Sequence, residues 1–434
     1  MSVDQEKRDC ASRREIVRKY LEVAAIPLRT VQASSGFQDL EPLKKVLDRV
    51  RVVGLGESTH GTREFFQLKH RLLEFLVKEM GYTVFSIEAS YPACCNDINN
   101  YVLYGKGDRS TALASQGFWT WDTEEVSSMV DWMREYNRTC DRGREVKFLG
   151  YDPQRVERGM EIVEAYLTKT APQEVHMAKD AFESVNGLFK GRFWEQREES
   201  DDFRCQGMDR LYRLIGFIAK NKVPFVRASS REEYEWALQN ARVICQYFDC
   251  YSERPIRMSS RDVYMAENIE YIAKYLEPDA KLVVWAHNAH ILNGTVKDGP
   301  SMGAHLRRVF GEEYYALGMA FDEGSFQSRD SSANRSGGPL TEFTVGPTPE
   351  GFLEWYLSGA PYSNYIVDFR SEPVVGPVRD WLSTPLPMRN IGSGFKANST
   401  PLDYSQEVVL ADNFDGMAFV KKATRAVPNP TGRR

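Results

Sequence analysis

The chain has 434 residues, of which 42% are hydrophobic and 12% aromatic, and it carries a formal net charge of −5. This composition is typical of a packed globular protein and excludes a largely disordered chain. The sequence has no strongly basic run, which argues against nucleic acid as a partner. The length allows one large α/β domain with insertions, or two domains.

The first twenty residues, MSVDQEKRDCASRREIVRKY, contain no apolar segment of the signal-peptide kind. No stretch reaches the roughly 20 apolar residues of a membrane-spanning helix. We therefore expect a cytoplasmic protein without a membrane partner. Its seven cysteines are scattered and never spaced C-x-x-C, which disfavours a disulfide framework and a cysteine zinc site.

Short apolar runs bounded by turn residues predict the strands of a sheet. They are continuous runs, as expected of strands buried on both faces, and do not alternate with polar residues. In chain order they are 50–56 (VRVVGLG), 82–90 (YTVFSIEAS), 146–152 (VKFLGYD), 281–287 (KLVVWAH), 314–321 (YYALGMAF), 364–369 (NYIVDF) and 415–420 (DGMAFV). Helical patterns at 64–80 and 125–137 lie between them, so the sequence predicts an α/β fold with a largely parallel sheet.

One region interrupts this alternation. Residues 155–278 show successive helical periods and little strand signal, which indicates a large helical insertion forming a cap. The α/β core would then comprise residues 1–154 and 279–425. A polar loop is expected at 327–340 (QSRDSSANRSGGPL) and a disordered tail at 426–434.

Polar side chains follow the ends of four consecutive predicted strands. Ligands of open α/β sheets bind at the carboxyl ends of the strands, where loops present side chains without interrupting the ladder. Three of the six histidines of the chain lie at two of these ends. The residues at the four ends are, in chain order, Glu57 and His60, Glu88, Asp152, and His287 and His290. We expect them to lie along one edge of the sheet.

The stretch GLGESTHG, residues 54–61, is open to several interpretations. It lacks the G-K-[ST] ending of a phosphate loop. Its Glu57-x-x-His60 pair, with the pair His287 and His290, suits a zinc site in residue type, although neither pair has the spacing of H-E-x-x-H. A nucleophilic role for Ser58 is a weaker interpretation, because the residues around it do not form a G-x-S-x-G elbow. The remaining interpretation is a general base, His60, oriented by Glu57.

Four segments resemble the erythromycin esterases: GLGESTHGTREFFQLKHRLLEFLVKEMGYTVFSIEAS, FLGYDPQ, RDVYMAENI and VVWAHNAHI. The similarity extends from about residue 43 to 320, and more thinly to the end of the chain. The resemblance implies hydrolysis of a macrolide lactone ester by activated water, on a Rossmann-like core with a helical cap. It leaves the substrate open, because one fold hosts many activities.

The resemblance also implies roles for individual residues. His60 matches the catalytic histidine of the family, Glu57 its partner acid and Glu88 the second acid. The histidine pair matches His287 and His290. The basic helix residue of the family matches Lys69, where macrolide-resistance members have arginine. Lysine keeps the charge but loses the bidentate geometry, so the chain differs from the macrolide-resistance members at this position.

The working hypothesis is that His60 takes a proton from water as the water attacks an ester or lactone carbonyl, while Glu57 orients the imidazole. Glu88 would position the water or act as a second base, and His287 or His290 would stabilise the oxyanion or protonate the leaving group. Trp119 and Trp121, in GFWTWD, are expected to contact a large apolar substrate. Lys69, Asp152 and Arg261 are the remaining predicted substrate-binding residues.

Three alternatives stay open on the sequence. The first is a metal-dependent hydrolase, with a divalent ion such as zinc, although we expect no cofactor. The second is a tailoring enzyme of natural-product biosynthesis that opens, isomerises or eliminates. The third is a non-catalytic binding protein. In each case the expected partner is a small molecule, and the sequence leaves the oligomeric state open.

Overall fold

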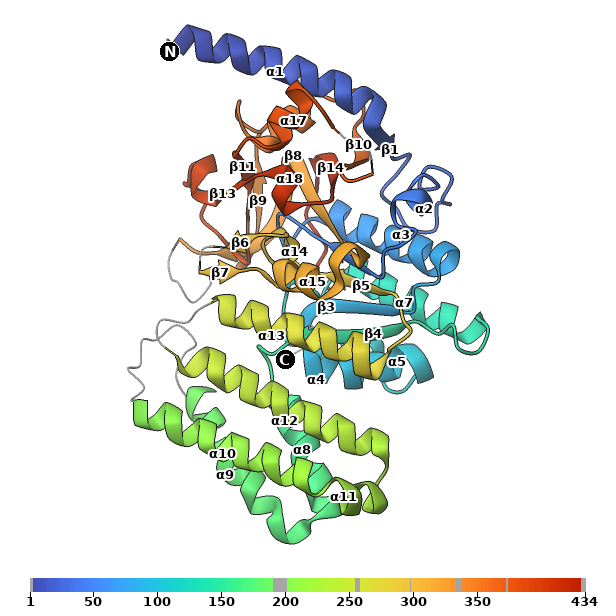
Figure 1. The fold of residues 1–434 in the computed structure, drawn as a ribbon, viewed down its shortest axis with the longest axis vertical. Coiled ribbons are helices and arrows are strands. Elements are labelled where there is room, and N and C mark those ends of the chain that lie inside the picture. Colours follow the sequence, from blue (N-terminus) through green and yellow to red (C-terminus); the bar gives the residue numbers. More distant parts are fainter. Residues whose placement is uncertain are drawn as a thin grey trace. The chain divides into compact units, whose positions relative to one another are not determined.

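The fold is described from a computed structural model, and the description covers residues 3–189, 201–253, 258–296, 298–332, 338–371 and 374–430 (Figure 1). The backbone forms two compact units. The first unit contains Met1–Ser86, Phe118–Lys147 and Glu270–Arg434, and the second contains Ile87–Gly117 and Phe148–Ile269. The predicted insertion, 155–278, overlaps the second unit, which also includes the segment after the second predicted strand.

The sheet of the first unit is largely parallel, which confirms the predicted α/β fold. Its strands follow the order β1 (Ala25–Pro27), β10 (Asn364–Asp368), β14 (Gly416–Ala423), β8 (Tyr314–Asp330), β2 (Val52–Leu55) and β5 (Leu282–Trp285). Strands β14, β8, β2 and β5 are parallel, whereas β10 runs antiparallel to both of its neighbours. Every residue of β2 and β5 is buried, as expected for strands covered on both faces.

Strand β8 is much longer than predicted. Beyond Phe321 it continues as a ribbon that pairs with β9 (Leu340–Val345) and with β12 (Gly394–Phe395). The ring of Phe326 stacks on Phe343 at 6.1 Å, so this ribbon has a hydrophobic contact of its own. The polar loop predicted from residue 327 therefore begins too early: Arg329 still pairs with Leu340, while residues 333–337 lie outside the described residues.

The helices of the first unit follow the apolar periods of the sequence. Helix α3 begins after Thr62 and ends at Gly81, whose φ of 73° is the left-handed conformation that glycine tolerates best. Thr123 caps α7 by accepting a hydrogen bond from the Val126 N–H. The helices of this unit are α1 (Val3–Ala24), α2 (Leu43–Val46), α3 (Arg63–Met80), α7 (Glu124–Thr139), α14 (Asn288–Ile291), α15 (Met302–Phe310), α16 (Leu353–Leu357), α17 (Pro377–Leu382) and α18 (Leu410–Asn413).

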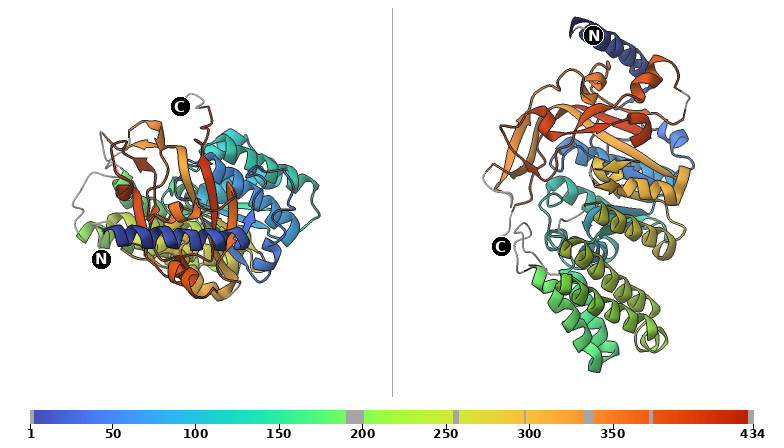
Figure 2. Two further views of the ribbon diagram at one scale, coloured as in Figure 1. Left: turned by 90° about the horizontal axis from the view of Figure 1, so that it is seen from above. Right: turned by 60° about the vertical axis from the view of Figure 1, so that its left-hand side comes forward.

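The second unit is mostly helical. Strand β3 (Val84–Ser90) enters it from the first unit, and β4 (Lys147–Asp152) is its neighbour in the sheet. Helices α8, α9, α10 and α12 pack against one another, as the right-hand view in Figure 2 shows. Its helices are α4 (Tyr91–Ala93), α5 (Asn99–Tyr104), α6 (Arg109–Ala114), α8 (Glu157–Thr170), α9 (Val175–Phe189), α10 (Asp201–Lys220), α11 (Lys222–Ala228), α12 (Arg231–Ser252) and α13 (Met258–Tyr271). That they cap the substrate remains a prediction.

The end of the chain is better ordered than predicted. The Ala426 N–H donates to the Gly61 carbonyl at 2.9 Å, and the Asn429 N–H donates to the Asp122 carbonyl at 3.0 Å. The Asn429 side chain also donates to Asp122 Oδ1 at 2.9 Å. These bonds fix residues that the sequence analysis placed in a disordered tail, while 431–434 lie outside the described residues.

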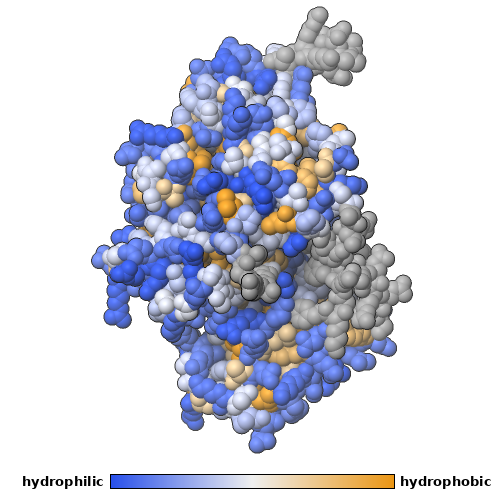
Figure 3. Space-filling model, turned by 180° about the vertical axis from the view of Figure 1, so that it is seen from behind, coloured by the Kyte–Doolittle hydropathy of each residue, from blue (hydrophilic) through white to orange (hydrophobic). Residues whose placement is uncertain are grey.

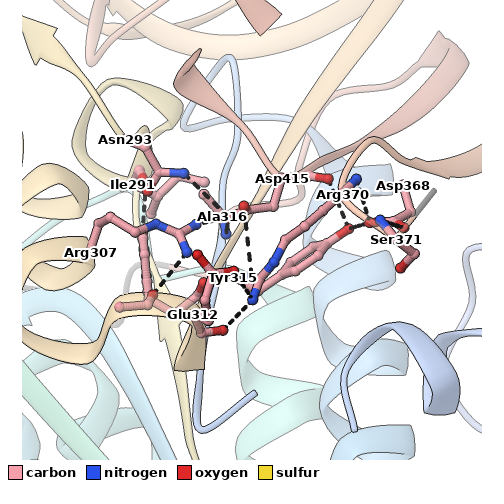
Figure 4. Close-up of polar contacts among 12 residues, drawn as sticks. Ile291, Asn293, Arg307, Glu312, Tyr315, Ala316, Asp368, Arg370, Ser371 and Asp415 are labelled. Atoms are coloured by element: carbon pink, nitrogen blue, oxygen red, sulfur yellow. Dashed lines mark hydrogen bonds and ion pairs between the residues drawn. The ribbon is translucent and has the colours of Figure 1, made fainter. Parts of the chain in front are cut away.

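A charged network occupies the amino edge of the sheet, where β8 and β14 begin (Figure 4). Asp415 forms an ion pair with Arg307 and accepts a hydrogen bond from the Ala316 N–H at 2.7 Å. Arg370 Nη1 lies 3.7 Å from Asp415, and the Tyr315 hydroxyl donates to Asp368 at 2.8 Å. These groups pair with one another, so the polar side chains at the carboxyl edge of the same strands form a separate set.

Hydrophilic residues predominate on the face drawn in Figure 3, and hydrophobic ones occur there in small groups. The most exposed large apolar side chains of the described residues include Val23, Tyr275 and Val375, which are scattered along the chain. None of the helices in the described part of the chain has the length and apolar character needed to cross a membrane.

Helix α3 supplies a prediction about acid stability. Burial lowers the pKa of His70 to about 4, and the charge of Lys78 adds to this effect. In the unfolded chain this histidine therefore binds a proton near pH 6.5, whereas in the folded chain its imidazole stays neutral until about pH 4. Stability should consequently fall as the pH drops through this window, by about 1.4 kcal/mol per pH unit from this one group.

The measurement is urea unfolding of wild type and His70→Leu between pH 4 and 7. The variant should lose less stability than wild type over this range, because it lacks the group that protonates on unfolding. Equal losses in the two proteins would contradict the prediction. The control is His176→Leu, which removes an exposed histidine and should follow the wild-type curve.

Candidate active site

The loop after β2 lies next to the loop after β5, because these strands are parallel neighbours. Leu55 pairs with Trp285, and the chain then presents Glu57 and His60 on one side and His287 on the other. A main-chain bond of 2.8 Å from the Asn288 N–H to the Glu57 carbonyl joins the two loops. The predicted convergence of these two strand ends is therefore present in the structure.

Two glycines of GLGESTHG are required by close packing. A Cβ atom on Gly56 would lie 2.1 Å from Asn288 Oδ1, and one on Gly61 would lie 1.9 Å from the Gln327 carbonyl oxygen. The Asn288 side chain needs this position, because it exchanges two hydrogen bonds with the main chain of Met319, at 2.8 and 3.0 Å. The glycines thus let the loop pack directly against β8 and the start of α14.

Glu57 is the centre of the site, and its carboxylate is completely buried. One oxygen lies 2.7 Å from His60 Nδ1, and the other accepts from Lys69 Nζ at 2.6 Å and from Trp285 Nε1 at 2.8 Å. Lys69 is itself fully buried, with its ammonium 4.3 Å from the centre of the Trp285 ring. The lysine charge therefore compensates the buried carboxylate, which would otherwise be costly.

This arrangement fixes the tautomer of His60. An ionised Glu57 accepts a hydrogen bond, so it requires the proton of His60 on Nδ1 and leaves Nε2 as an acceptor. The His60 side chain retains 12% of its exposure. Its ring contacts Trp121 edge-on at 5.6 Å and lies 5.0 Å from the ring of His287. His60 thus has the geometry of a general base oriented by a carboxylate.

His287 is held by the main chain. Its Nδ1 accepts from the Ala289 N–H at 3.3 Å, which places the proton on Nε2, and Nε2 lies 3.3 Å from the Ile391 carbonyl oxygen. The Ile391 N–H in turn donates to the Ser58 carbonyl at 2.7 Å. His287 is therefore oriented by the main chain, and it is tied to the loop of His60 through one residue.

His290 lies on the short helix α14, and its N–H donates to the His287 carbonyl at 3.0 Å. Its side chain is partly exposed, unlike the buried ring of His287. The two histidines of WAHNAHI therefore differ in their surroundings, although the sequence did not distinguish their roles.

Three other predicted site residues form a group in the second unit. Arg261 Nη2 lies 2.7 Å from Glu88 and 2.7 Å from Asp152, and Arg261 Nε donates to the second oxygen of Asp152 at 3.1 Å. All three side chains are buried. Burial alone would lower the pKa of Arg261, but the charges of Asp152 and Glu88 raise it well above its usual value. Glu88 is therefore paired with a cation.

The structure revises the interpretation of Lys69. The sequence predicts a substrate-binding role for it, but its ammonium is buried against Glu57 and Trp285. Trp121 is also buried, at 2% exposure, and its ring contacts His60, whereas Trp119 is partly exposed. Of the two tryptophans of GFWTWD, Trp121 is the one that forms part of the His60 environment.

Sequence reasoning missed three residues of this site. Trp285 donates to Glu57, Asn288 packs against Gly56, and Ile391 joins His287 to Ser58. Trp285 and Asn288 lie close to His287, at a strand end that the sequence identifies, so the same reasoning could have found them. Ile391 acts through its main chain, and a side-chain pattern carries no signal for such a role.

The remaining interpretations of GLGESTHG are tested by the surroundings of its side chains. The Ser58 hydroxyl is buried and has no hydrogen-bond partner among the described residues, so no described base activates it. Thr59 Oγ1 accepts from the Gly61 N–H at 3.1 Å, as a residue of a turn. Within the described ranges, no group of three or more histidine, cysteine, aspartate or glutamate side chains is placed to hold a metal ion.

A family model described as erythromycin esterase matches residues 77–423. An erythromycin esterase type II of Escherichia coli is 27% identical over 374 residues, which cover 80% of this chain and 87% of that protein. The family match begins after Lys69, so the cluster around Glu57 is supported by its own contacts and not by that match.

Two solved structures share the fold. A protein described as a succinoglycan biosynthesis protein superimposes with a TM-score of 0.82 at 23% identity, over 96% of this chain and 99% of that one. A mutant of the erythromycin esterase EreC in its open conformation has a TM-score of 0.61 at 19% identity, over 91% of this chain and 96% of that one. At these identities the similarity establishes the fold alone.

Proposed function

Because the chain belongs to the erythromycin esterase family, we propose that it is a carboxylic ester hydrolase that cleaves an ester or lactone of a macrolide-like or other natural product. The observation that supports this most is the buried contact between Glu57 and His60 Nδ1, at 2.7 Å, at the carboxyl end of a parallel strand. A carboxylate in this position makes the opposite nitrogen of the imidazole a base.

In the proposed reaction, His60 Nε2 takes a proton from water while the water oxygen bonds to the carbonyl carbon. The resulting oxyanion re-forms the carbonyl as the carbon–oxygen bond of the ester breaks, and the protonated His60 returns its proton to the leaving alkoxide. The products are an acid and an alcohol, so the substrate gains one water. Glu57 stabilises the positive imidazole between the two proton transfers.

The proposal assigns the other residues by their contacts. His287 has both ring nitrogens engaged by the main chain, so we assign oxyanion stabilisation to the partly exposed His290. Glu88 is paired with Arg261 and acts in positioning, not as the base, and Asp152 and Arg261 remain our proposed substrate-binding pair. Trp121, with Trp119, offers an apolar surface to a large organic substrate.

The test is a panel of macrolides, other lactones and simple aryl esters, with product masses read by mass spectrometry. The proposal expects at least one lactone to gain the mass of one water, or at least one open-chain ester to give an acid and an alcohol whose masses sum to that of the ester plus one water. A macrolide is the first to try because of the family. For a lactone, a product of unchanged mass would indicate isomerisation or a ring-opening elimination, and a product lighter by one water would indicate dehydration. Either result would replace hydrolysis with a tailoring reaction.

Chelation gives a separate prediction. The proposed base needs no metal, so dialysis of the purified enzyme against EDTA should leave its hydrolytic rate unchanged within twofold. The check is the rate before and after dialysis, with metal content by plasma mass spectrometry. A loss of activity that zinc or manganese restores would favour the metal-dependent alternative, in which Glu57 and His60 serve as ligands.

A further inference from the structure

A buried carboxylate lies behind the segment that joins His287 to the loop of His60. Glu354, on α16, is completely buried, and its Oε1 accepts a hydrogen bond from the Arg389 N–H at 2.8 Å. Its second oxygen has no hydrogen-bond partner among the described residues. The cost of burying a carboxyl in this way calls for an explanation, and the reaction described above does not use it.

Glu354 is bonded to the first residue of the segment 389–391, and each residue of this segment makes hydrogen bonds. The N–H of Asn390 donates to the Tyr404 carbonyl at 2.8 Å. The Arg389 side chain donates to Thr348 Oγ1 at 3.0 Å and to the Asp322 and Gly346 carbonyls at 2.8 Å each. Two residues later, the main chain of Ile391 makes the two bonds described above, one to Ser58 and one to His287.

We propose that Glu354 is a positioning residue for the active site, acting through the main chain of residues 389–391 on the orientation of His287 and on the loop that carries His60. The expected effect of Glu354 on turnover rests on the proposed function. Its effect on the orientation of His287 is a property of the free protein and does not depend on the substrate. Glu354 contacts no reacting group, so it acts only through Ile391.

The charges around Glu354 make its positioning effect depend on pH. Burial raises the pKa of Glu354 to about 7, and the positive charge of Arg389 partly opposes this rise, while Asp322 adds to it. Among the described residues, Arg389 and Asp322 are the charged groups with the largest effect on it. Above pH 7 the carboxylate carries a buried charge, and below pH 7 the group is neutral. The hydrogen bond that it accepts from the Arg389 N–H therefore differs in strength between the two forms. Glutamine matches the neutral form in shape and charge.

The test uses Glu354→Gln, which keeps the acceptor oxygen, and Glu354→Ala, which removes it. The matched control is Glu74→Ala, another fully buried glutamate that accepts a main-chain N–H, that of Ser34 at 2.8 Å. The first readout needs no substrate: imidazole ¹⁵N spectra report which nitrogen of each histidine is protonated. The second is the division between kcat and KM on whichever ester the enzyme hydrolyses.

We expect Glu354→Ala to disturb the Nε2-protonated signal of His287 and to lower kcat by about 10- to 100-fold with little change in KM, because a small misplacement of catalytic groups has effects of this size. At pH 6, where the wild-type carboxyl is neutral, Glu354→Gln should retain both the signal and kcat. Across pH 6 to 8 the His287 signal should shift in wild type but not in Glu354→Gln.

An unchanged His287 signal in Glu354→Ala, or the same loss of kcat in Glu74→Ala, would overturn the proposal. If Glu354→Ala does not fold, the comparison of wild type with Glu354→Gln across pH decides, and identical titrations of the His287 signal would overturn it. Failure to hydrolyse any ester would refute the proposed function and leave the spectroscopic result standing.

Discussion

Replacing His60 by asparagine should lower kcat/KM by about 10²- to 10⁴-fold, the usual contribution of a general base. Asparagine retains a polar side chain of similar reach beside Glu57 but cannot accept a proton from water. The variant should fold normally, because the His60 side chain is partly exposed and contributes one ring contact each to Trp121 and His287. The measurement is steady-state kinetics on the ester identified by the substrate panel.

Two controls make this result interpretable. The thermal midpoint of His60→Asn should lie within a few degrees of wild type, which separates loss of chemistry from loss of fold. His176→Asn replaces a histidine exposed on the second unit and should keep the wild-type rate. Near-normal turnover by His60→Asn would exclude His60 as the base.

Replacing Lys69 by methionine should be the most destabilising single change in this site. The substitution leaves the fully buried carboxylate of Glu57 without its cation, and breaking a buried pair in this way typically costs about 3–5 kcal/mol of unfolding free energy. The remaining donors, His60 and Trp285, do not replace the lost charge. Urea unfolding at pH 7 measures the difference.

The matched control is Lys421→Met, which removes an exposed lysine and should change stability by less than about 0.5 kcal/mol. The double variant Lys69→Met with Glu57→Gln should recover part of the lost stability, because it also removes the unpaired carboxylate. If Lys69→Met is as stable as Lys421→Met, the lysine does not serve as the counter-ion of Glu57.

The parallel strands were predictable because burial on both faces leaves continuous apolar runs, as in β2 and β5. The extension of β8 was not, because its residues beyond Phe321 are polar or glycine except for Phe326, and they derive their order from pairing with β9. The short strand β1 likewise depends on an antiparallel partner, β10, that lies more than 300 residues away in the sequence. Such partners leave no local pattern.

The candidate site was partly predictable for a related reason. The pairing of Glu57 with His60 could be inferred, because both residues follow one buried strand. The grouping of Glu88, Asp152 and Arg261 into an ion-paired set was not inferred, and neither was the burial of Lys69, because both depend on packing that spacing does not encode. Ile391 makes its bonds to Ser58 and His287 through its main chain, and Glu354 accepts from a main-chain N–H, so neither contact leaves a recognisable pattern in the sequence.

The most direct test of the central claim, that Glu57 and His60 activate water against an ester, is the reaction in H₂¹⁸O. Wild type should convert its substrate to an acid that contains one ¹⁸O atom, and His60→Asn should form this product at no more than about a hundredth of the rate. A product without the label, or equal labelling rates in the two proteins, would contradict the claim.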